Sequence, residues 1–312
     1  GDPDDPASEG GLAQQLSEAA GVSPRFIWSQ VIDDPVPSFW RTLRMQDAPF
    51  PTVSIIAQNE VFRVARAEGT RVMLGGQGGD EGFMGYNKFR LFQIRRLIQQ
   101  RRYAAALAMG WSLGQNLSAW ASRLQTYWRR RHRYLYDEGP TTALNLPDVT
   151  LPRACLAPDE AVWQRQVRDV TEISLPTLLR YEDRNSAGNS IESRLPYVDV
   201  NVLEFGAGLP IEAKLNHGFG KWLLRAANAE LVPDAIRVNR SKRGFDVQQP
   251  RWIAGGLGAE IRRTLHNRHN VVREWLPADA DIDTLFSDAR LGQQPQAFAE
   301  AVSLIWLSET AA

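Results

Sequence analysis

One stretch decides the fold class of this chain: Arg71-Val-Met-Leu-Gly-Gly-Gln-Gly-Gly-Asp-Glu81. Its first four residues predict a short, buried parallel strand, and four of the next five residues are glycine. Residues 52–68, just before it, lack Gly and Pro and carry apolar side chains near helical spacing. We therefore expect a helix there that ends at Gly69. Helix, strand and glycine loop in this order are typical of a doubly wound α/β layer.

The glycine loop indicates a backbone that a ligand can approach closely. Exposed N–H groups in such a loop bind anions, above all where a helix follows. It is not a Walker A loop, since no Lys-Ser/Thr follows, and Glu81 stands where a GxGxxG fingerprint counted from Gly76 needs its last glycine. Asp80 and Glu81 would repel a bare polyphosphate but attract one that carries Mg²⁺. The alternative is a tight glycine turn whose acids cap a helix N-terminus.

A second stretch, residues 183–199, reads Asp-Arg-Asn-Ser-Ala-Gly-Asn-Ser-Ile-Glu-Ser-Arg-Leu-Pro-Tyr-Val-Asp. It is dense in charged, amide and hydroxyl side chains and has no amphipathic stripe. Such density favours a buried hydrogen-bonded network or a polar ligand site, and a solvated loop is the alternative. We expect Asp183, Glu192 and Arg194 to be at least partly buried and hydrogen-bonded to one another, because an unpaired buried charge costs several kcal/mol.

The lysines form a third signal. Only four of the 36 cationic residues are lysine: Lys88, Lys214, Lys221 and Lys242. Where arginine is the usual cation, a lysine suggests a compact point charge, for example against a phosphate; plain surface placement is the alternative. Lys221 begins the run Lys-Trp-Leu-Leu-Arg225, which makes it the lysine of greatest interest.

Composition excludes several classes of protein. The 312 residues include 36 basic and 36 acidic side chains and are 43% hydrophobic, which is ordinary for a globular protein of two or three domains. Zero net charge argues against a nucleic-acid partner, and no apolar run approaches the roughly 18–20 residues of a membrane span. Cys155 alone cannot form an internal disulfide or a zinc site, and the acidic N-terminus is no secretory signal. We expect a cytoplasmic protein.

The organisation along the chain is a small α/β layer followed by a larger helical body. We expect residues 1–86 to form the remaining part of the α/β nucleotide-binding layer and residues 87–312 to be mostly helical. Within the helical part, residues 180–250 are expected to pack back on the active site.

Together the three tracts resemble the synthetase domain of the asparagine synthases. Residues 74–86 are similar to that family's L-S-G-x-G-x-D-E-x-F-x-G-Y segment, and residues 183–199 to its D-R-x-S-M-A-x-S-x-E-x-R-x-P-F-L-D segment. Residues 220–245 resemble its K-x-I-L-R tail, which ends in R-x-K-x-G-F. The similarity covers roughly residues 40–250 plus a weaker C-terminal tail, in the family's order.

The resemblance implies an N-terminally truncated, doubly wound parallel-sheet layer of the adenine nucleotide alpha-hydrolase-like (HUP) type, with a large helical C-terminal body. It implies two-step chemistry with ATP and Mg²⁺. The β-carboxylate of aspartate is adenylated with release of pyrophosphate, and ammonia from glutamine then attacks β-aspartyl-AMP. The partners are small-molecule substrates, with no nucleic acid and no membrane, and the resemblance allows a homodimer.

The resemblance also assigns roles to individual residues. Gly75, Gly76, Gln77 and Gly78 would line the ATP phosphates, and Asp80 would hold the Mg²⁺–pyrophosphate. Lys221 would stabilise charge on the phosphates. The remaining catalytic assignments are Asp183, which would help bind aspartate, Tyr86, which would pack at the site, and Gln77, whose carbonyl would orient ammonia.

Five departures from the family pattern accompany these assignments. Gly75 replaces a serine, Gln77 replaces an acid, and Ala187-Gly188 replaces Met-Ala. The pyrophosphate loop S-G-G-x-D-S and the glutaminase domain are not found in the sequence. We therefore expect a C-terminal fragment or a degenerate member that does not complete the reaction alone. The alternatives are a relative that adenylates another carboxylate, and a non-catalytic remnant that acts as an interaction module.

Overall fold

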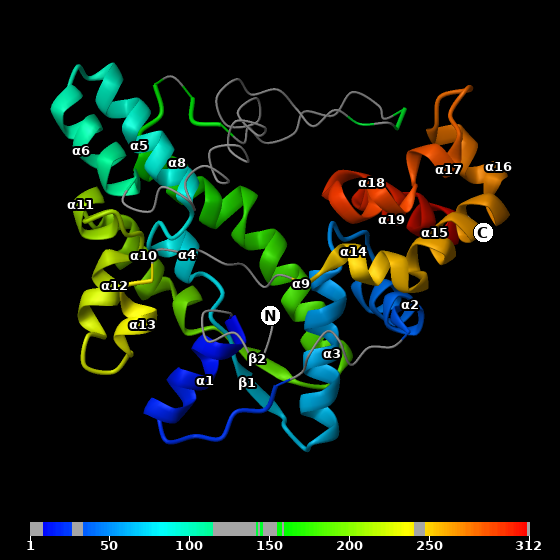
Figure 1. Ribbon diagram of the computed structural model, residues 1–312, viewed down its shortest axis with the longest axis horizontal. Coiled ribbons are helices and arrows are strands. Elements are labelled where there is room, and N and C mark those ends of the chain that lie inside the picture. The colour runs from blue at the N-terminus through cyan, green and yellow to red at the C-terminus, as the bar shows by residue number, and fades with distance from the viewer. Residues whose placement is uncertain are drawn as a thin grey trace.

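The computed structural model describes residues 9–26, 34–114, 142, 144–145, 155–157, 159–239 and 247–310. This part of the chain is mostly helical, with one small parallel sheet (Figure 1). The end of the third motif, residues 240–245, lies outside the described residues. None of the described helices combines the length and apolar character that crossing a membrane requires.

The first part of the chain carries the elements that the glycine stretch predicts. The helix expected over residues 52–68 is α3, and Gly69 after it has a φ of 88°, as a helix-ending glycine does. The predicted strand follows as β1, and the loop leads into α4. The elements are α1 (Glu9–Ala19), α2 (Pro35–Gln46), α3 (Ser54–Ala67), β1 (Val72–Leu74), α4 (Gly79–Gly82), α5 (Asn87–Gln99) and α6 (Tyr103–Gly114).

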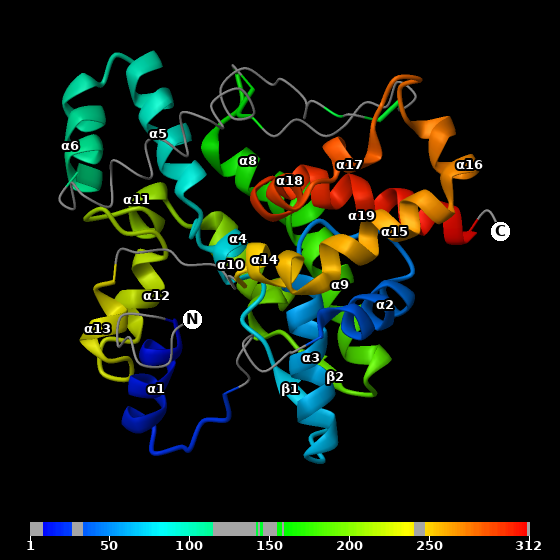
Figure 2. The ribbon, with the colours of Figure 1, turned by 45° about the vertical axis from the view of Figure 1, so that its right-hand side comes forward.

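The middle part is also helical apart from one strand. It contains α8 (Val162–Arg168), a π-helical turn (Asp169–Ile173), α9 (Leu175–Gly188), β2 (Glu192–Arg194), a 3-10 turn (Pro196–Val198), α10 (Val200–Gly208), α11 (Ile211–Lys214), α12 (Trp222–Ala227) and α13 (Asp234–Arg237). Figure 2 shows α1 lying beside α13, far from it in sequence.

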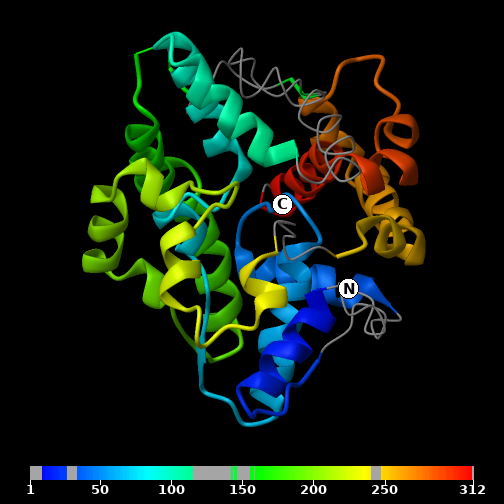
Figure 3. The same ribbon diagram turned by 60° about the vertical axis from the view of Figure 1, so that its left-hand side comes forward.

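The last part is a helical subdomain that lies on the opposite side of the molecule from α10–α13 (Figure 3). It contains α14 (Gln249–Trp252), a π-helical turn (Ile253–Leu257), α15 (Gly258–Asn267), α16 (His269–Val272), a 3-10 turn (Arg273–Trp275), α17 (Ile282–Leu285), α18 (Asp288–Gln293) and α19 (Pro295–Thr310).

The sheet joins the first and second motifs. β1 pairs in parallel with β2, with Val72 opposite Glu192 and Leu74 opposite Arg194. Within the described residues the sheet has these two strands only, so the doubly wound HUP arrangement stays a prediction.

The prediction that β1 is buried is wrong for the described structure. Val72 is 43% exposed and Leu74 75% exposed, while Met73, which points to the other face, is half-buried. Side chains alternate between the two faces of a strand, and the face that carries Val72 and Leu74 is uncovered here.

Two apolar clusters hold the helices together. The larger packs α2, α3 and α9 against the C-terminal helices, with Phe39, Phe50 and Phe298 at its centre. The smaller packs α5 against α8 and α11 through Phe89, Phe92 and other side chains (Met84, Leu156, Val162, Leu215). The glycine loop lies between elements that belong to the two clusters.

Candidate functional site

The glycine loop turns sharply between β1 and α4. Gly78 has a φ of 89°, a left-handed conformation that favours glycine, and it serves as the N-cap of α4. The N–H groups of Gly76, Gln77 and Gly78 donate no hydrogen bond within the described part of the chain. Three unused donors in one short loop form a cradle suited to an anion.

Two of the loop glycines have close neighbours. A Cβ on Gly75 would come within 2.6 Å of Glu182 Oε1 and of Leu195 Cδ2, and one on Gly78 within 2.9 Å of Val198 Cγ2. The segment 182–198 therefore packs directly on the loop. This packing also gives a physical reason for the departure at position 75, because a serine there would force the buried Glu182 or the Leu195 side chain to move.

Asp80, in the first turn of α4, forms an ion pair with Lys221. Their side-chain atoms Oδ1 and Nζ are 3.0 Å apart, and the side chains are 27% and 35% exposed. Gly85 packs closely against Asp80, since a Cβ at position 85 would collide with the Asp80 carboxylate. The structure thus brings together an acid and a lysine that lie 141 positions apart in the sequence.

Lys221 is held by its backbone as well as by its charge. Its φ is 53°, which is uncommon for a residue with a side chain, and its N–H donates to the Phe83 carbonyl at 3.2 Å. Gly220 packs so closely on the turn after α4 that a Cβ there would lie 2.7 Å from the Met84 carbonyl. A non-glycine residue in this conformation marks a site whose surroundings fix it.

Arg225 is a supporting residue that the sequence did not single out. Its Nε donates to the Gly220 carbonyl at 3.1 Å, and its Nη1 donates to the Ile236 and Arg237 carbonyls at the end of α13. Burial lowers the pKa of Arg225, and the negative charge of Asp80 opposes that shift. The side chain therefore joins the Lys221 turn to α13, and its place four residues after Lys221 in the motif was its only sequence signal.

The second acid of the motif, Glu81, is engaged inside the protein. It is 1% exposed and accepts a hydrogen bond of 2.5 Å from the Tyr86 hydroxyl. Burial and the neighbouring Glu81 charge raise the pKa of Tyr86 well above its usual range, so the hydroxyl stays a donor. Glu81 is thus a structural partner of Tyr86 and leaves Asp80 as the acid that faces the site.

A buried lysine is linked to α4 through hydrogen bonds. Lys214 is 0% exposed and donates to Gln166 Oε1 at 2.8 Å and to the Gly206 carbonyl at 2.9 Å. Gln166 in turn donates to the carbonyls of Glu81 and Gly82. Burial lowers the pKa of Lys214 to about 8. We call Lys214 and Gln166 the α4 clamp, because together they join α10, α8 and α4.

A pocket of about 480 Å³ opens on the other side of the loop. Gly75, Gly76 and Gln77 form one wall, and Glu182 of α9 adds a carboxylate. The other lining side chains come from the start of α3, from β1 and from α9 and are largely apolar (Pro51, Thr52, Ser54, Ile55, Gln58, Val61, Phe62, Met73, Leu178, Tyr181). Its size suits a small molecule.

The expectation that Asp183, Glu192 and Arg194 are at least partly buried is wrong, while their expected hydrogen bonding is confirmed for Glu192 and Arg194. All three are exposed; Glu192 and Arg194 pair with each other at 2.8 Å on the outer face of β2. Asp183 lies on the solvent side of α9 and does not line the pocket. The inward positions are their neighbours Glu182 and Ser193, whose side chains form a hydrogen bond of 2.6 Å.

The expected buried polar network does exist, with other members. Asn185 of α9 is fully buried, accepts hydrogen bonds from Gln46 and Asn59, and donates to Gln58 Oε1 and the Ile55 carbonyl. This network joins α2, α3 and α9 and sets the wall of the pocket. In the described structure this network fixes the positions of α2, α3 and α9 relative to one another.

The residues at the loop fit a nucleotide with a bound divalent cation. The unused N–H groups suit phosphate oxygens, and Lys221 adds a positive charge beside them. Mg²⁺ in nucleotide sites uses one or two carboxylates together with phosphate oxygens and water. Asp80 supplies one such carboxylate, while Glu81 is occupied by Tyr86.

The chain is similar in sequence to one protein family and to several curated proteins. A family model described as asparagine synthase matches residues 4–310. Asparagine synthetase (glutamine-hydrolyzing) 1 of Bacillus subtilis is 32% identical over 88 residues, which cover 28% of this chain and 14% of the relative. A putative asparagine synthetase (glutamine-hydrolyzing) of Mycobacterium bovis is 32% identical over 114 residues, covering 35% and 17%. Asparagine synthetase (glutamine-hydrolyzing) 3 of B. subtilis is 24% identical over 140 residues, covering 43% and 20%. No solved structure gives a significant match.

Proposed function

The chain belongs to the asparagine synthase family, and on that premise we propose that it carries the adenylating site of an ATP-dependent amide ligase. The matched segments cover 14–20% of the length of the curated relatives named above, so the activity of the whole protein is part of the proposal. One observation carries it: the Asp80–Lys221 pair stands beside a glycine loop with three unused N–H donors.

The reaction we propose activates a carboxylate by transfer of AMP from ATP. The carboxylate oxygen attacks the α-phosphorus, the bond to pyrophosphate breaks, and the acyl-AMP then reacts with ammonia to give an amide and AMP. A carboxylate is a poor acyl donor until its oxygen leaves as AMP, and the departing pyrophosphate needs positive charge around it. Mg²⁺, when bound, would neutralise part of that charge.

Each loop residue has a role in this proposal. The N–H groups of Gly76, Gln77 and Gly78 bind phosphate oxygens, and Asp80 holds the cation of the nucleotide. Lys221 stabilises the charge that develops on pyrophosphate. Its ammonium lies 3.0 Å from Asp80 Oδ1, and this ion pair orients it beside the loop.

We propose that the pocket behind Gly75–Gln77 takes the carboxylate substrate. The Gln77 side chain lines it, so its carbonyl can orient an incoming ammonia molecule, although an amide cannot act as a general base. Tyr86 acts through Glu81 to fix α4. For Asp183 a substrate contact remains a proposal that the exposed position of its side chain does not favour.

A second candidate is a relative that adenylates a carboxylate other than aspartate. The observation that favours it is the mostly apolar wall that α3 and β1 contribute to the pocket, in whose described lining Glu182 is the one charged residue. Such a wall suits a substrate with an aliphatic or aromatic body better than a small dicarboxylate.

The test is carboxylate-dependent exchange of labelled pyrophosphate into ATP, measured on the protein expressed from its complete gene. A panel of aspartate, glutamate and apolar amino and fatty acids identifies the substrate. We expect exchange with one class and a loss of about 10²- to 10³-fold in Asp80→Asn, because one transition-state contact of this kind is worth that much. Asp279→Asn, an exposed acid outside the site, is the matched control. Exchange with no carboxylate, or undiminished exchange by Asp80→Asn, contradicts the proposal.

A further inference from the structure

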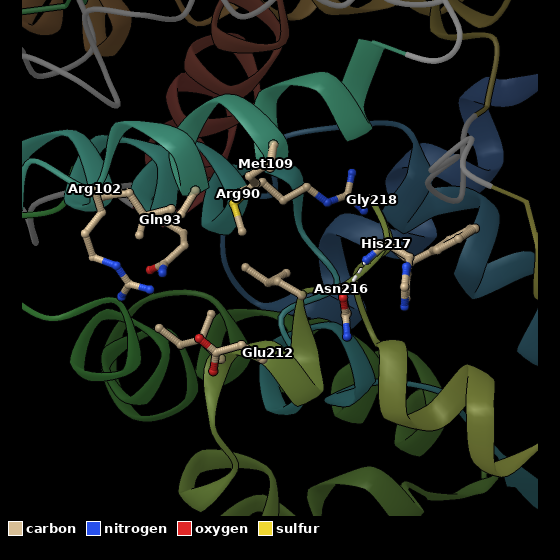
Figure 4. Close-up of a pocket in the computed structure, with 14 residues that line it drawn as sticks. Arg90, Gln93, Arg102, Met109, Glu212, Asn216, His217 and Gly218 are labelled. Atoms are coloured by element: carbon tan, nitrogen blue, oxygen red, sulfur yellow. Dashed lines mark hydrogen bonds between the residues drawn. The ribbon is translucent and has the colours of Figure 1, made fainter.

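We propose that a second pocket, between the α5–α6 hairpin and the segment 211–219, binds a free α-amino acid. It has a volume of about 430 Å³, within the range of small-molecule sites. Figure 4 shows side chains from the two helices facing the segment around Glu212 and Asn216 across this space. None of its lining residues lines the pocket beside the glycine loop.

The floor of this second pocket is apolar. Leu97 and Leu215 are buried there, at 4% and 5% exposure, and Met109, Ile211 and Phe219 continue the surface. Such a floor takes the hydrocarbon part of a ligand and lowers the local dielectric, so polar contacts above it are strengthened.

Gln93 is the first polar group that points to a ligand. It is 9% exposed, and its side chain forms no hydrogen bond with the residues that the structure describes. Because Gln93 lines the pocket, its amide can donate to and accept from a group that enters there. In Figure 4 the amide of Gln93 is directed into the pocket.

Arg102 and Glu212 add one positive and one negative charge on opposite walls. In Figure 4 Arg102 extends from the α5–α6 side and Glu212 faces it from α11. Neither side chain takes part in an ion pair or a side-chain hydrogen bond among the described residues. Their charges are therefore available to a ligand that carries both signs.

The three groups together select the ligand class. A carboxylate suits the guanidinium of Arg102, an ammonium suits Glu212, and a side-chain carboxamide both donates to and accepts from Gln93. A phosphate or a fatty acid would leave Glu212 unmatched and repelled. An α-amino acid with an amide side chain and aliphatic carbons matches Gln93, Arg102, Glu212 and the apolar floor.

The second pocket is lined by a segment that directly precedes Lys221 of the proposed active site in the sequence. The turn Asn216–Phe219, part of its lining, leads directly into Gly220 and Lys221. The rings of His217 and Trp222 lie 4.9 Å apart across this turn. A ligand here would contact the segment that presents Lys221 without occupying the glycine loop.

The test is titration calorimetry of the protein with L-asparagine and with L-glutamine, in the absence of ATP. We expect binding that falls at least about ten-fold when the amino group is acetylated or the carboxylate is amidated, because each block removes a charge-assisted contact. Arg102→Ala and Glu212→Ala should cause similar losses. Arg101→Ala and Glu204→Ala, exposed charges outside the pocket, are the matched controls.

A further pair of variants separates this pocket from the proposed active site. Gln93→Leu replaces the amide by an apolar side chain of similar size and should weaken binding. Lys221→Ala should leave binding unchanged. The proposal is overturned if neither amino acid gives a heat of binding, or if blocked and free ligands bind equally. It is also overturned if Lys221→Ala abolishes binding while Arg102→Ala does not. These measurements do not depend on pyrophosphate exchange, so they can fail or succeed independently of the proposed function.

Discussion

At the scale of the residue, Lys221 combines an ion pair with an uncommon backbone conformation. Its φ of 53° lets the N–H reach the Phe83 carbonyl while Nζ reaches Asp80. Replacement by alanine removes the charge and keeps a Cβ, whereas replacement by glycine removes the charge and suits the backbone. The two variants separate the electrostatic role from the conformational one.

We expect Lys221→Ala and Lys221→Gly both to lower adenylate formation by about 10²- to 10³-fold, because both lose the charge opposite pyrophosphate. Lys221→Arg should restore little of it, since a planar guanidinium cannot replace a compact ammonium at one point. Pyrophosphate exchange under substrate saturation measures this. Recovery of activity by Lys221→Gly relative to Lys221→Ala would show that backbone strain, and not charge, is what matters.

Gly75 offers a second test at this scale. A serine there restores the family's residue but places its Cβ 2.6 Å from Glu182 Oε1. We expect Gly75→Ser to destabilise the protein by about 1–3 kcal/mol, the usual cost of forcing extra atoms into a packed site. Gly76→Ser is the matched control, because a Cβ on Gly76 would meet nothing within 4 Å. Urea unfolding that gives equal midpoints for the two variants would contradict the close packing of α9 on the loop.

At the scale of the element, the position of α4 depends on the α4 clamp, Lys214 and Gln166. A helix of four residues has little stability of its own, so its place comes from neighbours. Lys214 binds the end of α10 and, through Gln166, the carbonyls of Glu81 and Gly82. The sequence marked Lys214 as one of four lysines but gave no sign that it is buried.

The clamp predicts a particular dependence of stability on pH. Burial lowers the pKa of Lys214 to about 8, while an unfolded lysine titrates near ~10.4. Between these values the unfolded chain binds more protons, so the free energy of unfolding should rise with pH, by roughly 3 kcal/mol at most. Above about pH 10 the raised pKa of Tyr86 acts in the opposite direction, which limits the useful window.

Urea unfolding of the wild type and of Lys214→Met from about pH 8 to pH 10 measures this contribution. The difference between the two proteins isolates Lys214, since Lys88, whose pKa burial also lowers, is present in both. We expect the rise to be smaller in the variant. Parallel curves for the two proteins would mean that Lys214 does not titrate in this range.

Elements were easier to predict than the direction of their side chains. The apolar spacing before Gly69 located α3, and the change from Val-Met-Leu to glycine located β1 and the loop. The burial of β1 and of Asp183 was predicted wrongly. A three-residue strand and one helical turn do not reveal which face meets the protein until the packing partner is known, so Met73 and Glu182 turned inward instead.

At the scale of the whole molecule, the proposed site lies between two separately packed bodies. The pocket wall of α3 and α9 belongs to the larger apolar cluster, while Met84, just after α4, belongs to the smaller one. Pairing of Asp80 with Lys221 across this arrangement was suggested by the family resemblance and not by any local pattern. The contact between residues 80 and 221 cannot be predicted from their spacing in the sequence unless the fold is already known.

The central claim, that the protein transfers AMP to a carboxylate, is tested most directly with an isotope. The carboxylate that supports pyrophosphate exchange is supplied with ¹⁸O in both carboxyl oxygens, together with ATP and ammonia, to the protein expressed from its complete gene. In an acyl-adenylate mechanism the carboxylate oxygen stays on phosphorus when the amide forms. We therefore predict one ¹⁸O in each AMP, measured by mass spectrometry, with AMP and amide in equal amounts. Label in inorganic phosphate with formation of ADP, or amide formation with unlabelled AMP, would contradict the account.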